Sequence, residues 1–168
     1  STIIIPRHVH RANEIKNEIE KENLKVYLHS SNKKIDHKTD IYLVDTYGET
    51  KKFFDISNIA FIGGSIINHG GQNPIEPARL GCKILHGPYV SNFAEPYDYL
   101  KKLGVAKKVN NANELGLSLV EELKRDEPKN QEIAEKIENY GQNILNNVII
   151  ELKKYINSYN RWIFLNQS

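Results

Sequence analysis

The sequence predicts an α/β fold with a Rossmann-like, doubly wound parallel sheet. Short apolar runs alternate along the chain with amphipathic stretches, and each run is almost continuously apolar. This pattern is typical of parallel strands that crossover helices bury on both faces. From Pro128 onward the alternation stops and one long helical pattern follows. We therefore expect a long C-terminal helix after the sheet.

The expected strands and helices follow one another in regular order. Ile3 to Ile5 form the first apolar run, and Ile15 and Ile19 then lie four residues apart, on one face of the first helix. Right-handed crossovers between such strands give the doubly wound arrangement. The expected strands are residues 3–5, 24–28, 41–44, 59–62, 83–85 and 105–109, with helices at residues 11–22, 49–56, 93–103 and 112–124 and one more that starts near Pro74 or Pro77.

The long final helix carries an apolar stripe with a spacing of three or four residues. Such a stripe is more often part of a core than anything else, so we expect it to pack over this domain and onto a preceding part of a longer protein. The stripe consists of Ile133, Ile137, Tyr140, Ile144, Val148, Leu152 and Ile156.

Composition excludes several classes of protein. The 168 residues are 39% apolar and 26% charged, which is typical of a soluble globular domain. With 23 basic and 21 acidic side chains there is no basic stripe, and this argues against a nucleic-acid surface. A single Cys excludes a disulfide framework, and no apolar run is long enough to cross a bilayer.

The beginning of the sequence suggests that further residues of a longer protein precede it. The sequence contains no Met, lacks the pattern of a signal peptide and opens directly on an apolar, strand-like run. A natural N-terminus seldom lies inside the first core strand. We therefore expect residues 1–168 to be the C-terminal part of a longer protein.

The polar residues that could bind a ligand follow the expected strands. In open parallel sheets the ligand lies beyond the carboxyl ends of the strands. Four segments are expected to meet at that rim, at residues 6–8, 45–49, 63–65 and 70–77.

The Gly63-Gly64-Ser65 turn is a candidate anion site. Its backbone N–H groups are free of side-chain obstruction, so a phosphate could approach closely. The alternative is a plain turn from strand to loop. The following Gly70-Gly71 pair and the helix start favour the anion site, because a helix N-terminus attracts phosphate.

Glu76 has two possible roles. If Asn73 is the N-cap and Pro74 the first helical residue, Glu76 would close a capping box. Pro77 would then clash with the Asn73 carbonyl at the fourth helical position. A helix that starts at Pro77 would instead leave the Glu76 carboxylate free to accept hydrogen bonds from a vicinal diol such as a ribose.

Arg7 follows a strand end and suits phosphate or carboxylate recognition, although a solvated surface arginine is the alternative. His8, His10 and His69 lack the spaced partners of a metal site, so capping or surface roles are expected for them. Cys82 is expected to be a small buried hydrophobe. The sequence contains no Ser–His–Asp order, Walker-type loop or GxGxxG motif.

Together these motifs resemble the C-terminal domain of the bacterial transferases of 3-deoxy-D-manno-octulosonic acid (Kdo), the enzymes of lipopolysaccharide assembly. The resemblance extends in order and spacing from about Ile3 to Lys124. One departure is Gln72, where the family usually has His, and the tail beyond about Tyr159 resembles nothing we recognise. The motifs that carry the resemblance are Pro6-Arg7-His8, Gly63-Gly64-Ser65, Gly70-Gly71-Gln72-Asn73-Pro74-Ile75-Glu76-Pro77-Ala78, Gly87-Pro88 and Asn92-Phe93.

The resemblance implies a two-domain, inverting glycosyltransferase of the GT-B type. Residues 1–168 would form its donor-binding domain and would bind CMP-Kdo without a metal or cofactor. The missing N-terminal domain would hold the lipid A precursor, the membrane anchor and the catalytic carboxylate, so no catalytic residue is expected in this chain. Carried over by position, and with the glycine turn added, the donor site would comprise Pro6, Arg7, Thr46, Tyr47, Gly48, Gly64, Ser65, Asn73, Pro74, Ile75 and Glu76.

The expected whole protein is a monomer at the cytoplasmic face of the inner membrane that contacts no nucleic acid. Two alternatives stay open at the level of sequence. One is the donor domain of another sugar-nucleotide enzyme, such as a UDP-dependent transferase or a 2-epimerase. The other is a Rossmann-like binding domain without chemistry.

Overall fold

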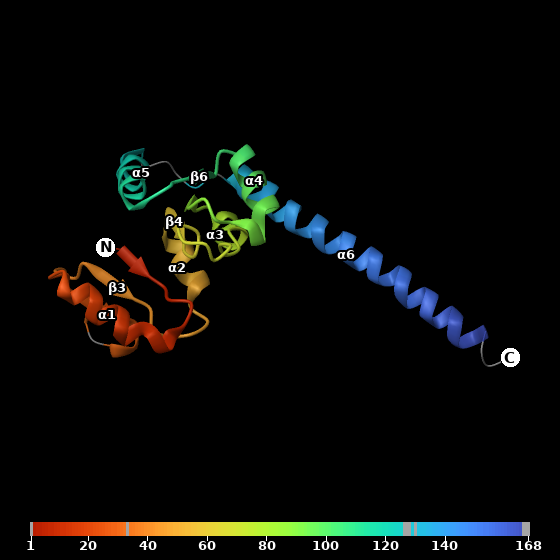
Figure 1. The fold of residues 1–168 in the computed structure, drawn as a ribbon, viewed down its shortest axis with the longest axis horizontal. Coiled ribbons are helices and arrows are strands. Elements are labelled where there is room, and N and C mark those ends of the chain that lie inside the picture. The colour runs from red at the N-terminus through yellow and green to blue at the C-terminus, as the bar shows by residue number, and fades with distance from the viewer. Residues whose placement is uncertain (1, 33, 126–128, 130, 166–168) are drawn as a thin grey trace. The chain divides into compact units, whose positions relative to one another are not determined.

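The computed structural model describes residues 2–32, 34–125, 129 and 131–165, with side chains up to residue 156 (Figure 1). The chain forms two compact units, residues 1–57 and residues 58–168. Each is built of parallel strands and helices.

The first unit holds a three-stranded parallel sheet in the order β1-β3-β2. Its strands pair in register, with Ile3 opposite Tyr42 and Tyr42 opposite Tyr27. Leu43 and Val44 at the end of the central strand are buried, and so is Phe53 on the helix that follows. The elements are β1 (Thr2–Ile4), α1 (Ala12–Lys21), β2 (Val26–Leu28), β3 (Ile41–Leu43) and α2 (Thr50–Ile56), with 3-10 turns at Val9–Arg11 and His29–Ser31.

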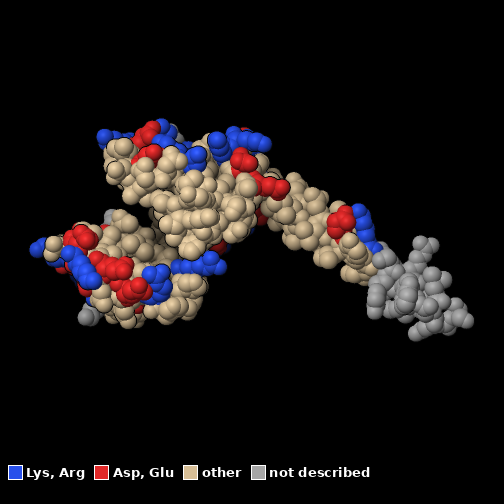
Figure 2. All heavy atoms as spheres, in the orientation of Figure 1, with Lys and Arg blue, Asp and Glu red and all other residues tan. Residues whose placement is uncertain are grey.

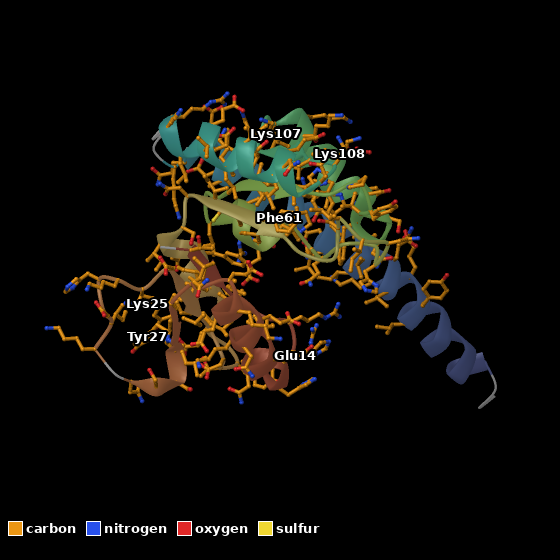
Figure 3. All side chains as sticks on the ribbon, turned by 60° about the vertical axis from the view of Figure 1, so that its left-hand side comes forward. Glu14, Lys25, Tyr27, Phe61, Lys107 and Lys108 are labelled. Atoms are coloured by element: carbon orange, nitrogen blue, oxygen red, sulfur yellow. The ribbon has the colours of Figure 1, made fainter. Side chains whose placement is uncertain are left out.

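The second unit holds another three-stranded parallel sheet, in the order β4-β5-β6. Ile84 and Leu85 of its central strand are fully buried, whereas the outer strands expose Phe61, Lys107 and Lys108 (Figure 3). The elements are β4 (Ile59–Ile62), α3 (Ile75–Arg79), β5 (Lys83–His86), a 3-10 turn at Ser91–Phe93, α4 (Ala94–Lys102), β6 (Ala106–Lys108), α5 (Ala112–Arg125) and α6 (Gln131–Leu165).

The predicted fold class is confirmed, and each expected strand and helix is present within a few residues of its predicted ends. In the described part of the chain the ladder hydrogen bonds form two three-stranded sheets, where the sequence suggested a single one. On the face drawn in Figure 2, basic and acidic side chains are interspersed over both units. This distribution agrees with the balanced composition.

The expectation that the apolar stripe of α6 packs over this domain holds only for its first turns, and the expected packing onto a preceding part of a longer protein stays a prediction. Ile137 is fully buried, and the first turns of α6 pack on α3. Ile144, Val148, Leu152 and Ile156, however, are 46–57% exposed. The reason is length: 35 residues of helix span about 52 Å, far more than the five-residue α3 can cover.

The helices that the structure describes include no candidate membrane span, since none combines the required length with sufficient hydropathy.

Candidate functional site

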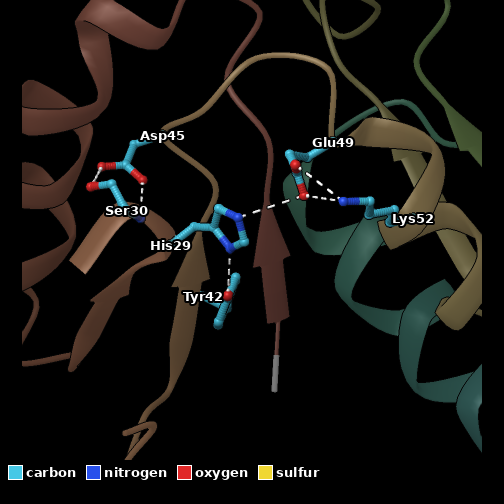
Figure 4. A network of polar contacts seen from close by, with 6 residues as sticks. All are labelled: His29, Ser30, Tyr42, Asp45, Glu49 and Lys52. Atoms are coloured by element: carbon cyan, nitrogen blue, oxygen red, sulfur yellow. Dashed lines mark hydrogen bonds and ion pairs between the residues drawn. The ribbon is translucent and has the colours of Figure 1, made fainter. Parts of the chain in front are cut away.

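The loop from Asp45 to Glu49 follows the central strand of the first unit and leads into α2. Its first residue is held by the end of the neighbouring strand β2 (Figure 4). The backbone N–H of Ser30 donates to Asp45 Oδ1 at 2.8 Å, and its hydroxyl donates to Oδ2 at 2.5 Å. Partial burial raises the pKa of Asp45, but these hydrogen bonds outweigh it, so the pKa lies below its ordinary value.

The last residue of this loop, Glu49, meets the same end of β2. His29 Nε2 lies 3.6 Å from Glu49 Oε2, which is within ion-pair range, and Lys52 Nζ lies 3.2 Å from the same carboxylate. The other ring nitrogen of His29 is 2.6 Å from the hydroxyl of Tyr42. An Nε2–H tautomer fits both contacts, because Nδ1 then accepts from the tyrosine. The ring also meets Phe53 edge-on at 5.6 Å.

Between these two anchors the loop presents Thr46, Tyr47 and Gly48. Tyr47 is 75% exposed, so its ring is available to a planar ligand. Gly48 has a φ of 81°, a left-handed conformation that favours glycine. The hydroxyl of Thr46 is buried and has no hydrogen-bond partner among the described residues.

Pro6 and Arg7 follow strand β1. Because β1 pairs in parallel with β3, the two strands end at the same edge of the sheet, and the structure brings Arg7 and the loop 45–49 to that edge. Arg7 is exposed, and its guanidinium has no hydrogen-bond or ion-pair partner among the described residues. An unpaired, permanently charged group at a strand end is available for an anion.

In the second unit the Gly63-Gly64-Ser65 turn follows β4. Gly64 has a φ of 68°, and Ser65 is fully buried. The Ser65 hydroxyl donates to the carbonyl of Ile62 at 2.5 Å and accepts from the N–H of Gly87 at 2.8 Å. Its side chain therefore holds the turn together, and any contact of Ser65 with a ligand would come from its backbone.

The next loop, residues 70–73, is tied to its surroundings by backbone hydrogen bonds. Gly71 N–H donates to Gly64 O at 3.0 Å, and Asn92 N–H donates to Gly70 O at 3.1 Å. The hydroxyl of the buried Tyr97 on α4 donates to the carbonyl of Gln72 at 2.9 Å.

Beneath this loop, burial raises the pKa of Tyr97, so its hydroxyl stays protonated and can donate. His86 packs against the Tyr97 ring with 4.4 Å between ring centroids. Tyr97, packed on His86, thus supports the loop 70–73 from inside the unit.

Helix α3 begins at Ile75, next to the first of its two predicted starts. The side chain of Asn73 accepts from the N–H of Ile75 at 3.0 Å, and Pro74 occupies the cap position. Pro77 is then the third helical residue, where an N–H would lack an intrahelical partner anyway, so the expected clash does not arise. The capping box is not formed at Glu76, because the helix starts at Ile75, which makes Glu76 its second residue, and among the described residues no hydrogen bond joins the Glu76 carboxylate to the N–H of Asn73. The Glu76 carboxylate is exposed and has no hydrogen-bond partner among the described residues.

The structure thus gathers the predicted site residues into two groups. Pro6, Arg7, Thr46, Tyr47 and Gly48 lie at the carboxyl edge of the first sheet. The second group, at the end of β4 and the start of α3, comprises Gly64, Ser65, Asn73, Pro74, Ile75 and Glu76. Each group belongs to a different unit, so the single rim shared by all four segments stays a prediction.

Sequence reasoning missed four residues that support these loops: His29, Ser30, His86 and Tyr97. His29 and Ser30 did carry a signal, since they are a polar pair directly after a strand. His86 ends β5 in the same way, whereas Tyr97 is indistinguishable in sequence from any other core residue of a helix.

Comparisons with known proteins agree with the resemblance seen in the sequence. No protein-family model matches the chain. The 3-deoxy-D-manno-octulosonic acid transferase of Haemophilus influenzae is 31% identical over 85% of this chain and 33% of its own length. That of Rickettsia prowazekii is 31% identical over 94% of this chain and 32% of its own length. A probable mitochondrial 3-deoxy-D-manno-octulosonic acid transferase of Arabidopsis thaliana is 36% identical over 70% of this chain and 25% of its own.

A solved structure extends the similarity to the fold. The C-terminal CMP-Kdo binding domain of WaaA from Acinetobacter baumannii superposes with a TM-score of 0.73 at 28% identity, covering 80% of this chain and 72% of that domain. The chain spans about a third of the length of the curated relatives it matches. Its sequence is similar to the sequences of the Kdo transferases, and it has the Rossmann-like fold of the C-terminal CMP-Kdo binding domain of WaaA.

Proposed function

We propose that this chain binds CMP-Kdo and acts as the donor-binding part of a Kdo transferase. The observation that carries the proposal is the match in fold and sequence to a CMP-Kdo binding domain. In the whole protein the acceptor is a lipid A precursor, held by an N-terminal part at the cytoplasmic face of the inner membrane. The general base also belongs to that part, so residues 1–168 alone bind the donor and transfer nothing.

The scheme proposed for CMP follows the site residues that the resemblance implies. The guanidinium of Arg7 pairs with the phosphate, and the carboxylate of Glu76 accepts from the ribose hydroxyls. The exposed ring of Tyr47 offers a face to the cytosine. The backbone N–H groups of Gly64 and Asn73 are further donors for an anion, whereas Pro74 has no N–H and that of Ile75 already donates to the side chain of Asn73. Metal and cofactor are not part of this scheme.

The proposal is tested by titrating the chain with CMP, UMP and cytidine, with heat of binding as the measurement. CMP is expected to bind more tightly than UMP. Arg7→Ala is expected to weaken the binding of CMP by about 1.5–3 kcal/mol, because the proposed partner of Arg7 is the phosphate. The binding of cytidine, which has no phosphate, should hardly change. Arg11→Ala is the matched control, since that exposed arginine is already paired with Glu14. Equal loss for CMP and cytidine in the Arg7 variant, or tighter binding of UMP, would overturn this scheme.

Glu76 is tested by the same titration. Glu76→Gln keeps the size of the side chain but removes its charge, and the affinity for CMP is expected to fall by about 1–3 kcal/mol. If the 2′-hydroxyl is a partner of Glu76, the parent chain and Glu76→Gln should bind 2′-deoxy CMP with nearly the same affinity. Because the carboxylate is exposed and unpaired, the melting temperature should not change.

A further inference from the structure

We propose that His29 and Ser30 are positioning residues for the nucleotide: together they fix the loop 45–49 at both of its ends. They are not among the residues assigned to the donor site. The inference rests on the proposed function, since it takes Thr46, Tyr47 and Gly48 as the part of this loop that contacts CMP.

The geometry of the contacts supports a clamp with two points. Asp45 and Glu49 are the first and last residues of the loop, and both carboxylates face the same dipeptide at the end of β2 (Figure 4). At the first point Ser30 donates both of its hydrogen bonds to Asp45, at 2.8 and 2.5 Å. At the second point His29 lies 3.6 Å from Glu49. The three residues between the two points are therefore held at each end.

The first point of the clamp, Ser30 with Asp45, is separate from the contacts that hold the unit together, whereas His29 also packs on the buried Phe53. Strands β2 and β3 are already joined by a parallel ladder whose last pair is Leu28 and Leu43. The core beneath the loop is formed by buried Leu43, Val44 and Phe53. Ser30, by contrast, is exposed, and its partner Asp45 is half-buried. Loss of such a solvent-facing pair should change the stability of the fold little.

The loop itself has little else to order its outer part. The ring of Tyr47 is 75% exposed, and a Cβ on Gly48 would meet nothing within 4 Å. A loop without packing must be ordered when a ligand binds, and that ordering reduces the affinity. A clamp that fixes the loop beforehand lowers this cost. His29 and Ser30 thus act on CMP through the loop, without touching CMP.

The test combines CMP titration with amide hydrogen exchange on the unliganded chain. Ser30→Ala is expected to raise the Kd for CMP about fivefold to tenfold, with an unchanged melting temperature. Ser30→Thr keeps the hydroxyl, so its Kd for CMP should stay close to that of the parent chain. Asp45→Ala should raise the Kd at least as much as Ser30→Ala, because it removes both hydrogen bonds whereas Ser30→Ala keeps the one from the Ser30 backbone N–H. The double variant should be no worse than Asp45→Ala, because that variant already removes this point of the clamp. His29→Phe keeps the ring packing on Phe53 and should raise the Kd by a smaller factor. Arg11→Ala, which breaks another exposed pair of the same unit, should change nothing.

Hydrogen exchange separates this inference from the proposed function. In Ser30→Ala the amides of residues 46–49 should exchange faster, while those of β2 and β3 keep their rates. If the parent chain fails to bind CMP, the proposed function is wrong and the exchange rates alone decide whether the clamp exists. If exchange at 46–49 and the Kd are both unchanged in Ser30→Ala, the clamp is wrong. A fall in melting temperature together with faster exchange throughout β2 and β3 would also overturn it, because the pair would then hold the fold.

Discussion

The two regions proposed to bind the donor are held in different ways. The loop 45–49 is fixed by Ser30 and His29, in the 3-10 turn that follows the neighbouring strand β2. The glycine loops, which we define as residues 63–65 and 70–73, are fixed from inside by the buried Ser65 and Tyr97. We therefore expect that changes at the contacts of the first loop leave the stability of the fold unchanged, whereas a change beneath the glycine loops should affect stability and binding together.

The largest effect is expected for Gly87→Ala. A Cβ on Gly87 would overlap the backbone of Ser65 and Ile66, which cannot move aside as a flexible side chain would. We expect a loss of about 3 kcal/mol or complete failure to fold. Gly63→Ala is the matched control, because a Cβ there would meet nothing within 4 Å. Denaturant unfolding of both variants measures the difference, and equal stability would mean that the glycine loops are not held from inside.

Tyr97→Phe is expected to cost less. The ring keeps its packing on His86, but the carbonyl of Gln72 loses the hydrogen bond that the hydroxyl donates. The expected loss of stability is about 1–2 kcal/mol, with weaker CMP binding beside it. Unfolding and titration on the same sample should therefore change together. If CMP binding alone changed, the support of the glycine loops would be separate from the stability of the fold, as we expect for loop 45–49.

The two regions should also differ in their response to acid. Burial lowers the pKa of His86 below 6.5, so in the folded state the ring resists protonation more than in the unfolded state. The unfolded state then binds more protons as the pH falls below 6.5, and stability should fall by up to about 1.4 kcal/mol per pH unit. His86→Gln should remove this dependence.

The contact between Ser30 and Asp45 should survive in that range of pH. The pKa of Asp45 is lowered from its ordinary value of 3.8. The stability that the ionised carboxylate contributes is therefore fully present above about pH 3.8 and is lost only as the pH falls further. Unfolding followed between pH 7.5 and 5 measures the His86 effect, and hydrogen exchange at 46–49 over the same range should stay constant.

The sequence was sufficient for the elements but not for the supports of the site. The apolar run at residues 83–85 predicts β5 because strands buried on both faces are continuously apolar. The start of α3 was harder, since the penalty for Pro77 depends on the helical position it finally occupies. Ser65 could not be identified as a structural residue, because its hydroxyl is held by Gly87, 22 positions along the chain. The apolar stripe of α6 predicts an amphipathic helix, but its spacing does not show how far a partner surface extends.

The smallest effect concerns the link between the glycine loops and the first turns of α6. Helix α3 carries Glu76 near its start and Arg79 at its end, and the guanidinium of Arg79 pairs with Glu138 of α6 at 2.9 Å. Both side chains are about 40% exposed, so water and salt screen the pair, and Arg79→Ala is expected to cost about 0.2–1 kcal/mol of stability. CMP affinity should stay the same, because the turn at Asn73 and the packing of Ile137 fix α3 independently of the pair. The double variant Arg79→Glu with Glu138→Arg should recover part of the loss at low salt. If Arg79→Ala weakens CMP as much as it weakens the fold, then α6 positions Glu76, and the glycine loops depend on a surface contact as loop 45–49 does.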